Sequence, residues 1–135
     1  MATKPKVFRN EKGVKDEVKK LLNQHGWFWW MTPANGYGVS GISDFCALRG
    51  GVFLAIETKF GGNKVTQLQR GYLESVLAEA GFGFEVNEKN IGWFAVWLDA
   101  FDRMAAAEAK KEKPDATDGA FILDAIQALT MWRGK

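Results

Sequence analysis

Hydrophobic and polar residues follow two periods along this chain, one typical of helices and one typical of strands. Apolar residues recur at helical spacing over 10–24, where Asn10 can cap the first turn and Gly26 ends the helix. The bulky run 27–31 predicts a buried strand, with its aromatic side chains in the core rather than stacked on bases. The glycine-rich segment 32–41 predicts a loop.

The middle of the sequence predicts a β-hairpin. We expect strands at 42–48 and 52–59, joined by a tight turn at Arg49-Gly50-Gly51. Gly61 and Gly62 interrupt the chain after the second strand.

The rest of the sequence combines helices with one short strand. Thr66 is placed to cap a helix that runs to about residue 80. A strand at 82–86 and helices at 91–111 and 120–132 follow. The order α-β-β-β-α-β-α-α predicts a mixed α/β fold in which helices flank a central sheet. We expect one domain over 1–113, then a linker and a C-terminal helix over 114–135 that pack on the domain or on a partner subunit.

Composition excludes several classes of active site. A chain of 135 residues, 47% of them hydrophobic, suits one globular domain with a core of its own. The single cysteine, Cys46, and the single histidine, His25, are too few for a disulfide framework, a zinc site or most nucleophilic catalysis by cysteine or serine. We expect His25, at a helix end, to be structural. An enzyme with this composition must use carboxylates and lysines.

The net charge of +2 conceals an uneven distribution. Residues 1–70 hold 11 lysines and arginines against 5 acidic residues, whereas 71–135 hold 7 against 11. A basic half indicates an anionic partner on one face, although chance clustering of solvated charges explains the pattern equally well. Because no apolar run reaches the length of a membrane span and no hydrophobic signal segment is present, we expect a cytoplasmic protein without a membrane partner.

Three residues of the predicted hairpin carry candidate chemistry. Side chains alternate along a strand, so Glu57 and Lys59 point the same way, and Asp44 starts the paired strand close to them. Two neighbouring carboxylates favour a hard cation, Mg²⁺ or Mn²⁺, with Asp44 and Glu57 as ligands. The carbonyl oxygen of Thr58 is placed to complete the site, and Lys59 faces the attacking water. The structural alternative is a turn aspartate beside a Glu57–Lys59 salt bridge.

The same segment resembles a known nuclease family. The run Gly41-Ile42-Ser43-Asp44, the strand 51–59 with its Glu-x-Lys, and the helix start Thr66-Gln67-Leu68-Gln69-Arg70 are similar to the VRR-NUC family (virus-type replication and repair nucleases) of the PD-(D/E)xK superfamily. The resemblance covers about residues 11–86, with Ser43 where the family has proline. It implies a restriction-endonuclease-like core and a Mg²⁺- or Mn²⁺-dependent DNA endonuclease without a small-molecule cofactor. It also implies a homodimer that acts on Holliday junctions or other branched DNA in phage replication, recombination or repair.

The resemblance further implies an acid on the first helix and a glutamine on the later one. Glu11 lies closer to the apolar face of the first helix than Glu17, which stays the alternative. Gln69 falls inside the apolar face of the later helix, whereas Gln67 falls opposite. We therefore expect Glu11 to act through a second metal or a metal-bound water, and Gln69 to orient Lys59 or the nucleophile.

Basic residues and the glycine-rich loop around this site are the expected contacts of a DNA backbone. Two other classes of function stay open: a non-cleaving nucleic-acid-binding module with the same fold, and an assembly protein that uses its acidic tail helices. The first predicts DNA binding without cleavage, and the second predicts no divalent-dependent activity. The expected DNA-binding residues are Lys12, Lys15, Lys19, Asn35, Tyr37, Lys64 and Arg70.

Overall fold

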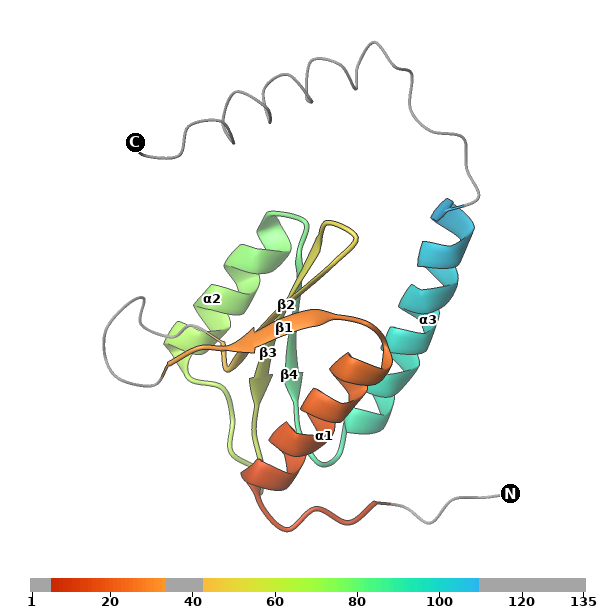
Figure 1. The fold of residues 1–135 in the computed structure, drawn as a ribbon. Helices are drawn as coiled ribbons and strands as arrows, with labels where there is room; N and C mark the ends of the chain where they lie inside the picture. Colours follow the sequence, from red (N-terminus) through yellow and green to blue (C-terminus); the bar gives the residue numbers. More distant parts are fainter. Residues whose placement is uncertain (1–5, 34–42, 110–135) are drawn as a thin grey trace, which may run out of the picture. The chain divides into compact units, whose positions relative to one another are not determined.

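The computed structural model describes residues 6–33 and 43–109, which form helices on a central sheet (Figure 1). Seven of the eight predicted elements are confirmed in their order. The helix expected at 120–132 lies outside the described residues, as does most of the loop expected at 32–41. In chain order the elements are α1 (Glu11–Gln24), β1 (Phe28–Met31), β2 (Phe45–Arg49), β3 (Val52–Thr58), α2 (Gln67–Ala78), β4 (Phe82–Val86) and α3 (Ile91–Ala109).

The four strands form a mixed sheet in the order β1-β2-β3-β4. Strands β1, β2 and β3 pair antiparallel in turn, whereas β3 and β4 pair parallel and are connected through α2. The β2–β3 hairpin turns at Gly50 and Gly51, whose φ angles of 56° and 80° favour residues without a side chain. This α/β arrangement confirms the predicted fold class and is compatible with a restriction-endonuclease-like core.

One face of the sheet carries the main hydrophobic core. Helix α1 begins as predicted, because the Asn10 side chain accepts a hydrogen bond from the Gly13 backbone N–H at 2.9 Å. Its buried side chains pack on the sheet, and apolar residues of α3 close the same core. The main members of this core are Val14, Val18, Leu22, Phe45, Leu54, Ile56, Phe94, Leu98 and Phe101.

Helix α2 covers the other face, over β3 and β4. It lies so close to β4 that a Cβ on Gly83 would stand 3.1 Å from the Leu73 carbonyl oxygen. The chain divides into two compact units, 1–105 and 106–135, and the sheet, α1 and α2 belong to the first. Within 6–33 and 43–109, no helix has both the length and the apolar character needed to cross a membrane.

Strand β1 is not the buried strand that its aromatic composition predicts. Phe28 is 70% exposed and Trp30 is 40% exposed, whereas Trp27, just before the strand, is buried. The prediction that the aromatic side chains of this run lie in the core is therefore wrong for Phe28 and Trp30, but Trp27 is buried and Trp29 packs against the core. The reason is topological: β1 lies at the edge of the sheet, and α2 packs on β3 and β4 rather than on β1.

Candidate active site

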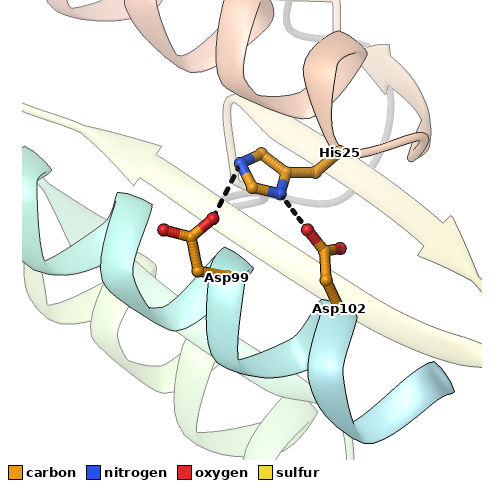
Figure 2. Close-up of side chains that lie close together, drawn as sticks. All are labelled: His25, Asp99 and Asp102. Carbon is orange, nitrogen blue, oxygen red and sulfur yellow. Dashed lines mark hydrogen bonds and ion pairs between the residues drawn. The ribbon is translucent and has the colours of Figure 1, made fainter.

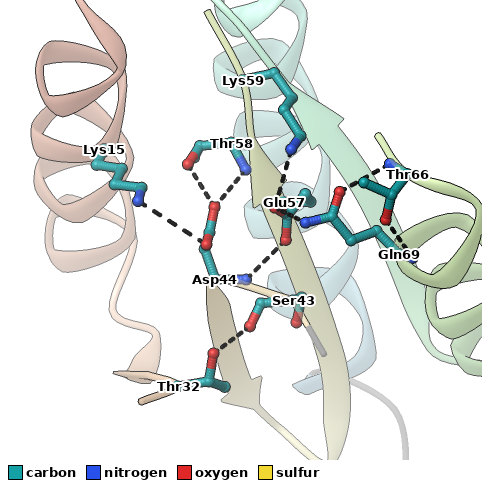
Figure 3. Close-up of polar contacts among 9 residues, drawn as sticks. All are labelled: Lys15, Thr32, Ser43, Asp44, Glu57, Thr58, Lys59, Thr66 and Gln69. Carbon is teal, nitrogen blue, oxygen red and sulfur yellow. Dashed lines mark hydrogen bonds and ion pairs between the residues drawn. The ribbon is translucent and has the colours of Figure 1, made fainter. Parts of the chain in front are cut away.

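Asp44 directly precedes β2 and is held against the end of β3 (Figure 3). Its Oδ2 accepts hydrogen bonds from the Thr58 backbone N–H at 3.0 Å and from the Thr58 hydroxyl at 2.7 Å. Its Oδ1 lies 3.9 Å from the Nζ of Lys15 on α1. The two bonds to Oδ2 fix the orientation of the carboxylate, and the lone pairs of Oδ1 stay available for a ligand.

Ser43, at the position where the resembled family has proline, orders the backbone next to Asp44 through hydrogen bonds. Its hydroxyl donates to the Phe45 carbonyl oxygen at 2.9 Å, and its own carbonyl accepts from the Thr32 hydroxyl at 2.6 Å. The Thr32 backbone N–H donates to the Asp44 carbonyl oxygen at 3.1 Å. These bonds restrain the chain on both sides of Asp44, as the fixed φ of a proline would before it.

Glu57 of β3 is a buried carboxylate at the centre of the site, with 2% of the residue exposed. Its Oε2 accepts from the Asp44 backbone N–H at 3.1 Å, and its Oε1 accepts from Gln69 Nε2 at 2.7 Å. Lys59 Nζ lies 3.6 Å from the same Oε1. Burial, and then the charge of Asp44, raise the pKa of Glu57 to about 7, against the opposing effect of Lys59. Burial is thus the main reason that ionisation of Glu57 is disfavoured, although a lysine lies near each of the two carboxylates.

Gln69 is oriented by the capping box that starts α2. Its Oε1 accepts from the Thr66 backbone N–H at 2.9 Å, while its own backbone N–H donates to the Thr66 hydroxyl oxygen at 3.2 Å. Because Oε1 is engaged in the cap, Nε2 is left to donate, and it donates to Glu57. The structure thus brings Gln69 to the predicted site through Glu57, rather than through Lys59.

Neither candidate acid of the first helix, Glu11 or Glu17, contacts Asp44 or Glu57. The Glu11 side chain makes no hydrogen bond or ion pair with another described residue, and Glu17 pairs with Lys6. The side chain of α1 that reaches the site is Lys15, one turn after Glu11 (Figure 3). Among the described residues, neither acid forms a cluster of three potential metal ligands with Asp44 and Glu57.

The predicted DNA-binding residues fall into separate groups. On α1, Lys12 and Lys19 lie 2.8 Å and 4.0 Å from carboxylate oxygens of Asp16, so both are already paired. Lys64 and Arg70, by contrast, line a polar cavity beside the start of α2. Asn35 and Tyr37 lie outside the described residues.

A second polar cluster, which the sequence gives no local signal for, joins the end of α1 to α3 (Figure 2). His25 Nδ1 donates to Asp102 Oδ2 at 2.6 Å, its Nε2 lies 3.8 Å from Asp99 Oδ1, and Arg49 also donates to Asp102. In the described part of the chain, His25, Asp99 and Asp102 are the group of three side chains close enough to share a metal ion. Because Arg49 and the His25 Nδ1–H already engage Asp102, we interpret the cluster as a structural tether.

Asp102→Asn is expected to lower the free energy of unfolding by about 1 kcal/mol, because the amide loses the charge that Arg49 and His25 contact at a partly exposed position. Burial raises the pKa of Asp102, but hydrogen bonds from Arg49 and His25 outweigh it and hold the pKa below 3.8. The stabilisation is therefore present above pH 3.8 and lost as the pH falls below this value.

Urea unfolding near pH 7 and near pH 3 measures this difference between the variant and the wild type. Glu74→Gln is the control, because it removes an exposed acid of α2 that forms no ion pair with another described residue. An equal loss of stability in both variants would contradict the tether.

Comparison with known proteins leaves the function to be argued from the site. No family model matches this sequence, and no curated protein matches it. The site brings Asp44, Glu57, Lys59 and Gln69 together at one end of the hairpin. Two carboxylates of this kind can hold a hard divalent cation and present an ammonium beside it.

Proposed function

We propose that this protein is a divalent-metal-dependent phosphodiesterase. More narrowly, we propose a DNA endonuclease, as the resemblance to the VRR-NUC family implies. The observation that carries the proposal is the buried Glu57 carboxylate, which accepts a hydrogen bond from the Asp44 backbone N–H at 3.1 Å and whose pKa is raised to about 7 by burial first and by the charge of Asp44 second. The hard oxygens of Asp44 and Glu57 fit Mg²⁺ or Mn²⁺ rather than a soft metal.

In this proposal the site residues have distinct roles. Asp44 and Glu57 would hold the metal, which polarises the scissile phosphate and lowers the pKa of a bound water. Thr58 orients the Asp44 carboxylate, and Gln69 orients that of Glu57. Lys59 orients the attacking water and stabilises the negative charge that develops on the phosphate. Two roles stay predictions: the Thr58 carbonyl oxygen as a metal ligand, and Glu11 acting through a second metal or a metal-bound water.

A nuclease assay with purified protein tests the proposal. Supercoiled, linear and four-way DNA are incubated with Mg²⁺, with Mn²⁺ or with EDTA, and the products are separated by electrophoresis. We expect cleavage with either metal, none with EDTA, and none by Asp44→Asn, which keeps an acceptor for Thr58 but loses the ligand charge. Glu79→Gln removes an exposed acid beyond the end of α2 and is expected to cleave like the wild type.

The outcomes separate the three classes of function. Cleavage that survives Asp44→Asn comes from another site or from a contaminant, and it would reject the proposed centre. DNA binding without cleavage of any substrate would favour the non-cleaving module. Absence of both DNA binding and DNA cleavage would favour the third class, an assembly protein. Faster cleavage of four-way DNA than of linear DNA would support a preference for branched substrates.

A further inference from the structure

A polar cavity of about 380 Å³ opens beside the candidate site. Its walls come from the segment after β3, from α2, and from the end of β4 with the turn that follows it. The volume lies in the range of cavities that bind small organic ligands. The lining residues used below are Lys64, Arg70, Glu85, Glu88 and Lys89.

Lining residues of the cavity neighbour residues of the candidate site along the chain and across the sheet. Arg70 follows Gln69, whose side chain donates to Glu57. Glu85 of β4 is the register partner of Glu57 across the parallel pair. The segment that begins with Lys59 also supplies the cavity's first lining residues. A nucleic-acid strand with one phosphate at Glu57 therefore has the cavity next to it on the β4 side.

The cations of this cavity differ from Lys12, Lys15 and Lys19 of α1, which lie close to carboxylates. Lys64, Arg70 and Lys89 form no ion pair with any carboxylate in the described part of the chain. Of the two acids in the cavity, Glu88 already accepts from the Gly61 backbone N–H at 3.2 Å and 3.3 Å. Glu85 has no side-chain partner among the described residues. Three cations against two carboxylates leave the lining with a formal charge of +1, which favours an anion.

We propose that this cavity binds a backbone phosphate of the cleaved DNA strand, adjacent to the scissile phosphate. Arg70, Lys64 and Lys89 are its contacts. The inference rests on the proposed nuclease function. An arginine can grip a phosphate through two parallel hydrogen bonds, and the lysines add point charges. Such contacts carry no sequence information but fix the register of the strand, so the cavity sets which phosphate lies over Asp44 and Glu57.

The salt dependence of DNA binding tests the inference. The dissociation constant of a labelled single-stranded DNA is measured by fluorescence anisotropy at several salt concentrations, in the Asp44→Asn background to prevent cleavage. Arg70→Ala, Lys64→Ala and Lys89→Ala are each expected to weaken binding several-fold and to reduce the slope of the logarithm of the binding constant against log salt by at most about 0.7, the value for one phosphate of single-stranded DNA. Arg103→Ala removes an exposed arginine of α3 and is the matched control.

Glu85 gives a test with the opposite sign. Glu85→Gln removes an unpaired negative charge from the cavity and is expected to tighten DNA binding, because the phosphate is then repelled less. Glu79→Gln removes an exposed acid from the other end of α2 and is expected to leave binding unchanged. A general effect of net charge would strengthen binding equally in both variants, and that result would overturn the inference.

Failure of this inference and failure of the proposed function give different results. If the wild type cleaves DNA and the three cavity variants bind DNA like Arg103→Ala, the phosphate cavity is wrong and the nuclease stands. If the wild type neither binds nor cleaves DNA, both are wrong. Binding that weakens in the cavity variants, with wild-type behaviour in Arg103→Ala, supports the cavity even if the protein does not cleave.

Discussion

Replacement of Lys59 by methionine is expected to lower the rate constant for DNA cleavage by about a hundredfold to ten-thousandfold, the range for loss of a proton-transfer or charge-stabilising group. Lys59 directly follows β3, its side chain is 15% exposed, and its Nζ lies 3.6 Å from Glu57 Oε1. Methionine keeps most of the apolar stem and removes the ammonium. Single-turnover cleavage at saturating Mn²⁺ measures the rate constant.

The pH dependence of this variant separates a direct role from an indirect one. Lys59 also lowers the pKa of Glu57, so its removal raises that pKa and weakens metal binding near pH 7. If Lys59 acted only in this way, raising the pH and the Mn²⁺ concentration would restore cleavage by Lys59→Met. A direct role predicts a deficit that persists at high pH.

The control for Lys59→Met is Lys20→Met, which removes an exposed lysine of α1 that has no ion pair among the described residues. Lys20→Met is expected to cleave DNA at the wild-type rate. Full recovery of Lys59→Met at high pH, or wild-type cleavage by this variant near pH 7, would overturn the direct role.

The hairpin and its polar residues could be predicted from sequence because their determinants are local. The glycines at 50 and 51 fix the turn, and the turn fixes the register that pairs Phe45 with Ile56. Continuing that register by one residue places Asp44 opposite Glu57, where the structure has their hydrogen bond. The proximity of Asp44 and Glu57 at the end of the hairpin therefore follows from the turn residues and from the two-residue period of a strand.

The orientation of Gln69 follows from helical phase, although the phase predicted from apolar residues is inaccurate in detail. Leu68 and Leu77, taken as part of the apolar face, are 64% and 50% exposed, whereas Leu73 is buried. The buried face of α2 is thus rotated towards Leu73, and Gln69 stays on the half-buried part of this face. The capping box at Thr66 could be read from sequence, but its coupling to Glu57 could not.

Features that depend on which elements become neighbours could not be predicted. Sequence pattern does not show that β1 lies at the sheet edge, so the exposure of Phe28 was missed. It also does not fix the rotation of α1 over the site, which brings Lys15 rather than Glu11 to Asp44. His25 and Asp102 are 77 residues apart, and no local period links them.

The metal-free protein is expected to lose stability between pH 5 and pH 8 because of Glu57. Folding raises the pKa of this residue from 4.5 to about 7, mainly through burial and then through the charge of Asp44. Between these two values the folded state binds more protons than the unfolded state. The free energy of unfolding therefore falls as the pH rises, by at most about 3 kcal/mol from this residue. Urea unfolding in EDTA across this range measures the decline.

Glu57→Gln is the control, because glutamine cannot ionise and its unfolding free energy should lack this decline. The glutamine has one acceptor oxygen for two donors, the Asp44 backbone N–H at 3.1 Å and Gln69 Nε2 at 2.7 Å in the wild type, so the variant is less stable from the start. The quantities to compare are therefore the slopes of the unfolding free energy with pH. Mn²⁺ at one hundred times its dissociation constant should stabilise the wild type by about 2.7 kcal/mol at pH 8. The gain should be smaller at pH 5, where protons compete for Glu57, and absent in Glu57→Gln.

Two results would remove the observation on which the proposed function rests. Parallel pH profiles of the wild type and Glu57→Gln would mean that burial beside Asp44 does not perturb the Glu57 carboxyl. Equal stabilisation of both proteins by Mn²⁺ would mean that the cation binds away from Glu57. Because both measurements follow unfolding rather than cleavage, they test the metal centre even if the DNA substrate has not been found.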